Sequence, residues 1–308
     1  MSTFTIAVPC STSNLGSGFD AIGIALSGPH LLVRAISGGS ALRIVRISGE
    51  GAEQLPRDAT NRLVQAAHLA AQNAGRAPAD LRAEIEVHSS IPLRRGLGSS
   101  AAAALAGALL ADRLLGGAVG DERVLAAAVA LEGHPDNVVP ALRGGAQVAV
   151  LGADGQVISC PVLLGAPLQA AVFIPDAELE TKAARAVLPV TVPLRDAVHN
   201  LGRAALLVAA LQSGRTELLG EAMNDRLHQP ARARLMPWLD SLIAKTREAG
   251  AAGAALSGAG TTVLALCAPG RAHDVANALR EAARASGLPG RAEVLDVGVP
   301  GARAVESP

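Results

Sequence analysis

The chain has 308 residues, with 27 basic and 27 acidic side chains, so it carries no formal net charge at neutral pH. Half of its residues are hydrophobic, yet it has three Phe, one Trp and no Tyr. A balanced charge creates no overall field for nucleic acid or a membrane surface, and no run of about 18 apolar residues could cross a bilayer. The composition therefore argues against nucleic-acid and membrane partners, and it predicts an aliphatic core in one large domain or two smaller ones.

The N-terminus and the cysteines bear on the compartment. The first residues, MSTFTIAVP, lack the charged start and the long apolar run of a secretory signal peptide. Cys10, Cys160 and Cys267 are widely spaced and form no metal-binding pattern. We therefore expect a cytoplasmic protein whose three reduced thiols behave as small buried hydrophobes.

Hydrophobic periodicity predicts a mixture of strands and helices along the chain. The expected strands are residues 4–8, 31–36, 42–47, 79–87, 147–151, 157–163, 168–174, 251–257, 262–267 and 292–297. The expected helices are residues 61–75, 101–115, 122–131 (capped by Asp121), 194–212, 231–249 and 271–286. This mixture predicts the α+β class rather than a doubly wound sheet.

Turn-forming and terminal residues suggest where the chain divides and ends. Gly165-Ala-Pro167 interrupts the predicted elements and marks the expected boundary between two domains, residues 1–164 and 165–308. The last residues, 301–308, are expected to fray because chain ends are often poorly held.

A glycine-rich stretch between a predicted strand and an alanine-rich predicted helix is the strongest local feature, Pro92-Leu-Arg-Arg-Gly96-Leu-Gly98-Ser99-Ser100. Gly96 and Gly98 allow a sharp turn and a close approach of the backbone to a ligand. Ser99 or Ser100 can cap the helix, whose N-terminal dipole favours negative charge. A Walker A loop is excluded because no Lys-Ser or Lys-Thr follows the second glycine. The stretch alone therefore fits a phosphate-binding loop or an ordinary capped turn.

Two further stretches concentrate polar groups. Asp20 lies between the apolar residues Phe19 and Ile22, where a carboxylate is costly unless it meets a cation or ligand donors. Residues 132–137 place two carboxylates, a histidine and an amide close together, and Pro135 blocks helix continuation. Both stretches would also suit ordinary polar turns, so they need support from the rest of the chain.

Taken together, these motifs resemble those of the GHMP small-molecule kinases. Residues 8–20, VPCSTSNLGSGFD, look like the first motif of that family, residues 92–102 like its phosphate-binding motif, and residues 256–261, LSGAGT, like its third. Within the family, EGHPDNV at residues 132–138 is similar to the homoserine kinases, as are the later stretches TKAARAVLP and DRLHQP. The matches follow the family's order and cover most of the chain.

The resemblance implies a two-domain α+β architecture, with an N-terminal domain like ribosomal protein S5 and a C-terminal ferredoxin-like α/β sandwich. It implies ATP-dependent phosphorylation of the side-chain hydroxyl of L-homoserine, in threonine biosynthesis, by a homodimer that uses Mg²⁺. A related kinase with a mevalonate-like or sugar-like acceptor is the first alternative. A non-catalytic descendant that binds nucleotide or an amino acid is the second, but it would be expected to lack residues such as Glu132 or Ser100, and both are present.

The same resemblance assigns the nucleotide and metal sites. The Mg²⁺ ligands fall on Glu132 and the Ser100 hydroxyl, with Ser99 as the competing choice. The family's usual Tyr-Asn pair after the first motif is missing, which leaves the adenine contacts open. The residues implied for ATP and its phosphates are Asn61, Pro92, Leu93, Arg94, Arg95, Gly96, Leu97, Gly98, Ser99, Ser100, Ala101 and Ala102.

The acceptor site also follows from the resemblance. Arg185 and Arg226 are expected to hold the substrate carboxylate, because a guanidinium offers paired donors to a carboxylate. An ammonium group on the same substrate needs an anion and an amide. The remaining implied acceptor residues are Asn14, Asp20, His134, Asn137 and Gly258.

Catalysis is implied to depend on Asn137, Glu132 and Ser100. Mevalonate-type relatives use an aspartate near the position of Asp136-Asn137, whereas the equivalent residue of homoserine kinases looks like Asn137, whose amide cannot take a proton. Positioning and a metal could suffice, because the transition state of phosphoryl transfer is loose. Asp136 is the alternative, as a general base.

Overall fold

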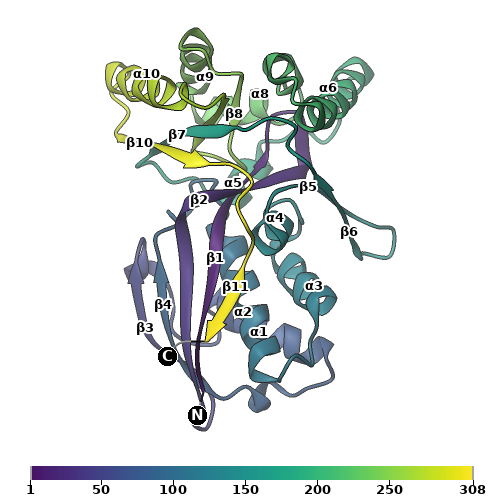
Figure 1. Cartoon of the computed structure of the whole chain (residues 1–308), viewed down its shortest axis with the longest axis vertical. Coiled ribbons are helices and arrows are strands. Elements are labelled where there is room, and N and C mark those ends of the chain that lie inside the picture. Colours follow the sequence, from purple (N-terminus) through teal and green to yellow (C-terminus); the bar gives the residue numbers. More distant parts are fainter. Residues whose placement is uncertain (1, 307–308) are drawn as a thin grey trace.

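Two β-sheets, one in each lobe of the molecule, organise the computed structural model, which describes residues 2–306 (Figure 1). Within those residues, the sheet that begins at the N-terminus has seven strands and the second sheet has four. Helices pack against each sheet, so the predicted α+β class is confirmed.

The elements have the following bounds. The strands are β1 (Thr3–Asn14), β2 (Gly18–Ser37), β3 (Leu42–Gly49), β4 (Ala83–Ser89), β5 (Ala146–Leu151), β6 (Val157–Val162), β7 (Gln169–Pro175), β8 (Gly253–Leu256), β9 (Val263–Cys267), β10 (Gly290–Asp296) and β11 (Arg303–Glu306). The helices are α1 (Arg62–Asn73), α2 (Ser99–Leu114), α3 (Asp121–Glu132), α4 (Val138–Arg143), α5 (Thr181–Ala186), α6 (Leu194–Ser213), α7 (Leu219–Ala222), α8 (Gln229–Arg232), α9 (Leu239–Glu248) and α10 (Ala272–Ala285).

The first sheet has the strand order β11-β1-β2-β4-β3, and β5 joins it through β2. β1 and β2 form a long antiparallel pair that reaches the turn at residues 15–17. β5 and β6 form an antiparallel hairpin. β3 pairs in parallel with β4 instead of with its chain neighbour β2. The β1–β2 turn reaches the second lobe, where the Ser17 hydroxyl donates to the carbonyl oxygen of Ala222 in α7.

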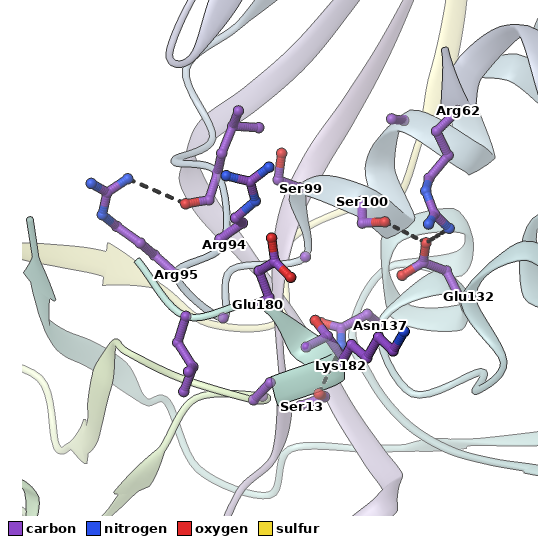
Figure 2. A pocket seen from close by; sticks show the side chains of 18 of the residues that line it. Ser13, Arg62, Arg94, Arg95, Ser99, Ser100, Glu132, Asn137, Glu180 and Lys182 are labelled. Carbon is purple, nitrogen blue, oxygen red and sulfur yellow. Dashed lines mark hydrogen bonds and ion pairs between the residues drawn. The ribbon is translucent and has the colours of Figure 1, made fainter. Parts of the chain in front are cut away.

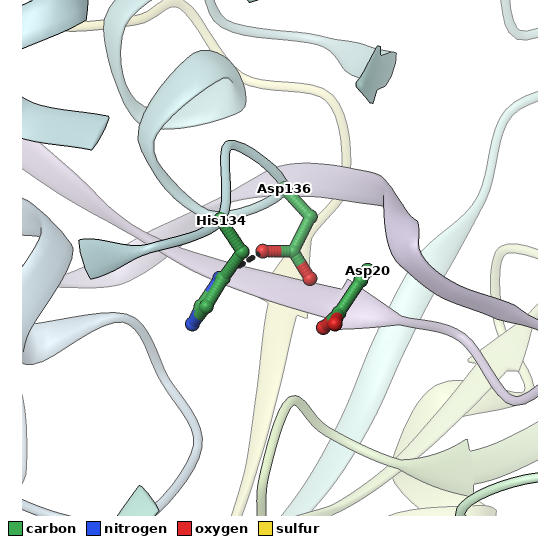
Figure 3. Close-up of side chains that lie close together, drawn as sticks. All are labelled: Asp20, His134 and Asp136. Carbon is green, nitrogen blue, oxygen red and sulfur yellow. Dashed lines mark hydrogen bonds and ion pairs between the residues drawn. The ribbon is translucent and has the colours of Figure 1, made fainter. Parts of the chain in front are cut away.

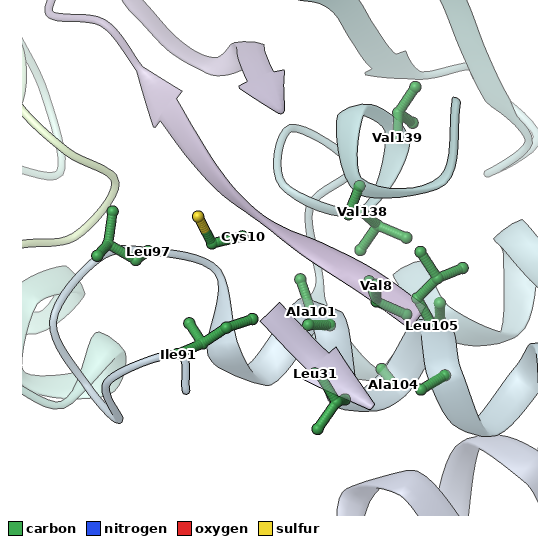
Figure 4. Close-up of a cluster of buried hydrophobic side chains, with 14 of the residues drawn as sticks. Val8, Cys10, Leu31, Ile91, Leu97, Ala101, Ala104, Leu105, Val138 and Val139 are labelled. Atoms are coloured by element: carbon green, nitrogen blue, oxygen red, sulfur yellow. The ribbon is translucent and has the colours of Figure 1, made fainter. Parts of the chain in front are cut away.

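The alanine-rich helix α2 is packed between the first sheet and α1. Figure 4 shows Val8 and Leu31 from the strands facing Ala101 and Leu105 of α2 in one buried cluster. Alanine suits this position because it has high helix propensity and a small side chain that allows close packing. At Gly107 of α2, an added Cβ would lie 1.9 Å from a backbone oxygen of α1. This packing holds the N-terminus of α2 in a defined place.

The second sheet, in the order β10-β7-β9-β8, is antiparallel throughout. Helices α9 and α10 pack against it around Phe173, Leu239 and Leu279 (Figure 1). In the described part of the chain, no helix is both long enough and apolar enough to span a membrane.

Helix boundaries follow capping and proline chemistry. Asn61 caps α1, since its side chain accepts a hydrogen bond from the backbone N–H of Leu63 at 3.0 Å. The prediction that Asp121 caps α3 is wrong, because Gly120 is the cap and Asp121 is the first helical residue. The single helix predicted over residues 231–249 is also wrong. It is divided into α8 and α9, with Pro237 between them, and proline interrupts helical hydrogen bonding.

The C-terminal tail and one cysteine also differ from the predictions. Residues 303–306 do not fray but pair with β1 as β11, while residues 307–308 lie outside the described residues. Cys160 on β6 is exposed, whereas Cys10 and Cys267 are buried as predicted. A short strand at the edge of the first sheet thus ties the end of the chain to its beginning.

Candidate active site

A cavity of about 450 Å³ lies where the two lobes meet. It is lined by the β1–β2 turn, the glycine-rich loop before α2, the segment between α3 and α4, the region around α5 and the loop between β8 and β9. These are the segments that carry the sequence motifs, so the fold brings the motifs together at one site.

The three glycine motifs contact one another directly beside this cavity. The backbone N–H of Gly258 donates to the carbonyl oxygen of Ser13 at 3.0 Å, and the Ser257 hydroxyl donates to the carbonyl oxygen of Gly96 at 2.6 Å. Gly96 has a φ of 76°, and an added Cβ would lie 2.1 Å from the Ser257 carbonyl oxygen. Glycine at residue 96 is therefore needed for the contact between the second and third motifs, whether or not a ligand is bound.

The N-terminus of α2 presents backbone donors to the cavity. Gly98 is the N-cap, with a φ of 73°, and no side chain caps the helix, so the prediction of a serine cap is wrong. In the part of the chain that the structure describes, the backbone N–H groups of Ser99, Ser100 and Ala101 have no acceptor. Unpartnered N–H groups at a helix N-terminus are well suited to an anion such as phosphate.

The other residues implied for ATP divide into two groups. Those that line the cavity are Asn61, Leu93, Arg94, Arg95, Gly96, Gly98, Ser99 and Ser100. Those buried behind it are Pro92, Leu97, Ala101 and Ala102. The Arg95 guanidinium donates to the carbonyl oxygens of Pro175 (2.7 Å) and Asp176 (2.6 Å), and Arg94 pairs with Glu178 at 3.0 Å. Both arginines therefore tie the glycine-rich loop to the second lobe.

Glu132 lies beside the unpartnered N–H groups of α2. Its Oε1 accepts hydrogen bonds from the Ser100 hydroxyl at 2.6 Å and from Arg62 Nη1 at 2.7 Å (Figure 2). No donor contacts Oε2 among the described residues. Arg62, the first residue of α1, was not predicted from the sequence, although it directly follows the Asn61 cap. A carboxylate and a hydroxyl next to free backbone donors form a donor set that suits Mg²⁺ with bound phosphate.

Asn137 is held rigidly at the centre of the cavity. Its Oδ1 accepts from the Ser11 hydroxyl at 3.0 Å. Its Nδ2 donates to the Ser13 hydroxyl at 2.7 Å (Figure 2). Only 9% of its surface is exposed. The first motif thus fixes the orientation of an amide that lies between the α2 end of the cavity and the charged end.

Asp20 and Arg185 form a bidentate salt bridge at the end of the cavity opposite α2. Arg185 Nη1 and Nη2 lie 3.0 and 2.9 Å from the two carboxylate oxygens of Asp20. The Asn14 side chain accepts from the Asp20 backbone N–H at 3.0 Å and donates to the Gly258 carbonyl oxygen at 2.7 Å. The structure therefore brings together these four predicted acceptor residues.

A second carboxylate lies beside this pair. His134 Nδ1 is 2.5 Å from Asp136 Oδ1, and Asp136 Oδ2 is buried with no partner among the described residues. Figure 3 shows the Asp136 carboxylate between His134 and Asp20, and the ligating atoms of the three residues lie within 4.8 Å of one another. Burial lowers the pKa of His134, but the hydrogen bond and charge of Asp136 outweigh it and raise this pKa overall. The concentration of negative charge suits a cationic group of a ligand.

Two arginines in and just after the stretch DRLHQP, Arg226 and Arg232, have different positions. Arg226 does not line the cavity. Its side chain is half exposed and pairs with Asp196 of α6 at 3.4 Å. Arg232, which the sequence did not single out, lines the cavity and is only 1% exposed. Burial, followed by the nearby Arg185 charge, lowers the pKa of Arg232 to about 10. Two guanidinium groups that repel each other in this way would be stabilised by an anionic ligand.

Comparisons with known proteins agree with this geometry. The family model "GHMP kinases N terminal domain" matches residues 61–145, and "GHMP kinases C terminal" matches residues 207–285. The chain is 45% identical over 264 residues to the homoserine kinase of Deinococcus radiodurans, which covers 85% of this chain and 83% of that protein. It is 43% identical over 263 residues to the homoserine kinase of Moorella thermoacetica, which covers 85% of this chain and 86% of that protein.

A solved structure gives the same result for the fold. The crystal structure of homoserine kinase from Cytophaga hutchinsonii superposes with a TM-score of 0.86 at 28% identity, and the match covers 99% of this chain and 98% of that chain. The first family match contains the glycine-rich loop, Glu132 and Asn137, and the second contains Arg232 and Gly258. The chain therefore belongs to the GHMP kinases and, within them, to the homoserine kinase family.

Proposed function

We propose that the protein transfers the γ-phosphoryl group of ATP to the side-chain hydroxyl of L-homoserine and forms O-phospho-L-homoserine, a step in threonine biosynthesis. One observation carries the proposal: a single cavity has unpartnered backbone N–H groups at one end and a cluster of opposite charges at the other. The first end suits phosphates, and the second suits an acceptor with both an ammonium and a carboxylate group. The similarity to homoserine kinases supports the same acceptor.

At the α2 end, the backbone donors of Ser99, Ser100 and Ala101 would receive the β- and γ-phosphates. Glu132 Oε2 and the Ser100 hydroxyl would hold Mg²⁺, which neutralises phosphate charge in phosphoryl transfer. The unpartnered Oε2 supports this role, and the contact of Ser100 with Glu132 favours Ser100 over Ser99 as the second ligand.

The nucleobase would be held by aliphatic side chains. Leu31, Ile47 and Val87 from β2, β3 and β4 belong to the cavity lining. Their presence supports an adenine site that depends on apolar contact and needs no tyrosine.

At the charged end, we assign the substrate carboxylate to Arg185 and Arg232. We replace Arg226 by Arg232 in this role, because Arg232 is the buried arginine that lines the cavity. The ammonium group would be bound between Asp20 and Asp136, where two carboxylates lie close together. Both assignments follow from matching charge, since a buried charge must be paired to be stable.

The chemistry would depend mainly on positioning. Asn137, oriented by Ser11 and Ser13, would direct the acceptor hydroxyl towards the phosphate. An amide cannot take the hydroxyl proton, and Asp136 is paired with His134 through Oδ1 and would bind the ammonium group through Oδ2. A loose transition state requires little assistance from a base, so orientation and charge neutralisation would supply most of the rate enhancement.

The proposal is tested by measuring ADP formation with homoserine, mevalonate and galactose in parallel, with ³¹P NMR of the product. We expect ADP release with homoserine and a phosphate ester on its side-chain oxygen. Release with mevalonate or galactose instead would favour another acceptor class. No ADP with any of the three would favour a non-catalytic binding protein.

We also propose that residues 1–164 form the ATP-binding domain and residues 165–308 the second domain. The two sheets support this division, although β11 returns to the first sheet. Three free thiols agree with a cytoplasmic location.

A homodimer would cover Leu194, Val198 and Leu201, which share one face of α6 and are 79%, 59% and 73% exposed. Light scattering of the wild type and of Leu201→Glu tests the dimer, which should dissociate in the variant.

A further inference from the structure

His228 is a buried histidine just before α8. It has no exposed surface, and its ring stacks on Phe19 with the centroids 4.8 Å apart. Its Nε2 lies 2.9 Å from the carbonyl oxygen of Gly16 in the β1–β2 turn. A carbonyl oxygen can only accept a hydrogen bond, so Nε2 carries the proton and donates it. This contact defines the tautomer of the ring.

The other ring nitrogen contacts an arginine of the acceptor site. With the proton on Nε2, the lone pair of Nδ1 is free, and Arg232 Nη1 donates to it at 3.1 Å. The same Nη1 donates to the carbonyl oxygen of Gly258 at 3.0 Å, and Arg232 Nε donates to the carbonyl oxygen of Ala184 at 3.3 Å. Partners from three separate segments therefore hold the guanidinium in one orientation.

This arrangement leaves one guanidinium nitrogen for a ligand. Among the described residues, no acceptor contacts Arg232 Nη2, and this nitrogen is not one of the fully buried unpartnered atoms. Because Arg232 lines the cavity, its free nitrogen is available there. Loss of the Nδ1 acceptor would remove one of the three contacts that orient the guanidinium and would leave an Nη1 proton without an acceptor, so Nη2 would be held less firmly in its direction.

We propose that His228 is a positioning residue for acceptor binding, which accepts a hydrogen bond from Arg232 and holds Nη2 towards the substrate carboxylate. The inference rests on the proposed function, in which Arg232 binds that carboxylate. An imidazolium ring could not serve, because Nδ1 would become a donor and two cations would face each other. Burial, only partly opposed by the Asp225 charge, lowers the pKa of His228, and the Arg232 charge lowers it further.

The groups around the ring are compatible with this neutral state. The Asp225 carboxylate lies 3.7 Å from Nε2 but accepts hydrogen bonds from Asn200 and from the backbone N–H groups of residues 227–229. Asp20, the other nearby carboxylate, is paired with Arg185. These partners offset part of the charge of each carboxylate, and burial outweighs the effect of both carboxylates on the pKa of the ring.

Two amide substitutions separate the two ring nitrogens. In His228→Asn, the side-chain carbonyl can take the place of Nδ1 and accept from Arg232, but the bond to Gly16 is lost. In His228→Gln, the amide can reach the place of Nε2 and donate to Gly16, but nothing accepts from Arg232. We expect the KM for homoserine to rise about tenfold in His228→Gln and less than about threefold in His228→Asn. The kcat and the KM for ATP should stay within about twofold in both variants.

An inhibitor without a carboxylate provides the specific control. 3-Aminopropan-1-ol keeps the hydroxyl and ammonium of homoserine, so its inhibition constant should be the same for wild type and His228→Gln. Equal KM increases in both variants, parallel losses for homoserine and ATP, or an equal effect on this inhibitor would each overturn the proposal. A wild-type enzyme that does not phosphorylate homoserine would instead refute the proposed function.

A measurement on the wild type covers the case of variants that do not fold. In ¹⁵N NMR of histidine-labelled protein at neutral pH, His228 should give a neutral ring with the proton on Nε2. Addition of homoserine should shift the Nδ1 resonance. A proton on Nδ1, or an imidazolium ring, would overturn the proposal.

Discussion

The two ends of the cavity offer ligand contacts of different kinds. At the α2 end, the donors are backbone N–H groups, and their positions follow from the loop that begins the helix. At the other end, the contacts are charged side chains from distant segments, as in the pair of Asp20 and Arg185, which are 165 residues apart. A backbone site can be recognised from one contiguous motif. A site made of side chains depends on which charged residues the whole fold brings to the cavity.

The largest expected effect tests the α2 end. Glu132→Gln keeps the shape of the side chain but removes the charge proposed to hold Mg²⁺, so kcat should fall by roughly a hundredfold. The Mg²⁺ concentration needed for half-maximal activity should rise. Steady-state assays over a magnesium titration provide the measurement.

Arg62→Gln is the matched control, because it removes the charged partner of Glu132 Oε1 and leaves the carboxylate in place. It should change the magnesium dependence much less than Glu132→Gln does. A titration of Glu132→Gln that superimposes on the wild type would exclude Glu132 as the ligand.

The next prediction tests the charged end with two arginines that lie close together in the sequence, Arg226 and Arg232. Arg232→Lys keeps a cation but loses the fixed guanidinium. The value of kcat/KM for homoserine should therefore fall, by an amount that corresponds to a loss of about 1.5–3 kcal/mol in transition-state binding free energy. Arg226→Lys should change it by less than about 0.5 kcal/mol, because its pair with Asp196 is exposed. The KM for ATP should hardly change in either variant. A larger loss in Arg226→Lys would restore Arg226 as the carboxylate ligand.

These arginines show why the sequence predicted one end of the site better than the other. The loop before α2, the helix start at Asn61 and most elements could be predicted, because each depends on neighbouring residues. The choice between Arg226 and Arg232 could not, since one lies within the short motif DRLHQP and the other only two residues after it. The answer depends on contacts with distant segments, because Arg226 precedes α8 and pairs with Asp196 of α6, whereas Arg232 ends α8 and donates to Ala184 and Gly258 beside the cavity.

The third prediction asks how tightly the backbone site is packed. Gly98 and Gly116 have similar φ values, 73° and 67°. A Cβ at Gly98 would lie 2.4 Å from the Ser11 hydroxyl oxygen, whereas a Cβ at Gly116 meets no described atom within 4 Å. Gly116→Ala should therefore cost about 1 kcal/mol of unfolding free energy from backbone strain.

Gly98→Ala should cost at least about 1 kcal/mol more than Gly116→Ala, because it adds overpacking to the same strain. Urea unfolding of both variants measures the difference. Equal losses would mean that the loop can move away from the first motif, and the backbone site would then be less rigid than the packing indicates.

The smallest effect concerns stability against pH, and it compares two histidines of the charged end. The pKa of His228 is lowered from its ordinary value of 6.5 in the folded protein. The unfolded chain therefore binds a proton first as the pH falls through 6.5, and stability is lost on the acid side. Between about pH 7 and about pH 5.5, this loss should be about 1 kcal/mol in the wild type, and it should be absent in His228→Asn.

His134 has the opposite sign, because its pKa is raised above 6.5 by Asp136 despite burial, which acts to lower it. Its contribution to stability is complete below pH 6.5 and is lost as the pH rises through the folded pKa. His134→Asn should therefore flatten the stability profile on the alkaline side and leave the acid side unchanged. Urea unfolding at a series of pH values measures both profiles. If both substitutions flatten the same side, one of the two rings has a different charge from the one its hydrogen bonds require. One outcome would contradict the assignment of His228. If His134→Asn loses the acid-side slope and His228→Asn keeps it, His228 is protonated in the folded protein. Its contact with Arg232 could then not form as described.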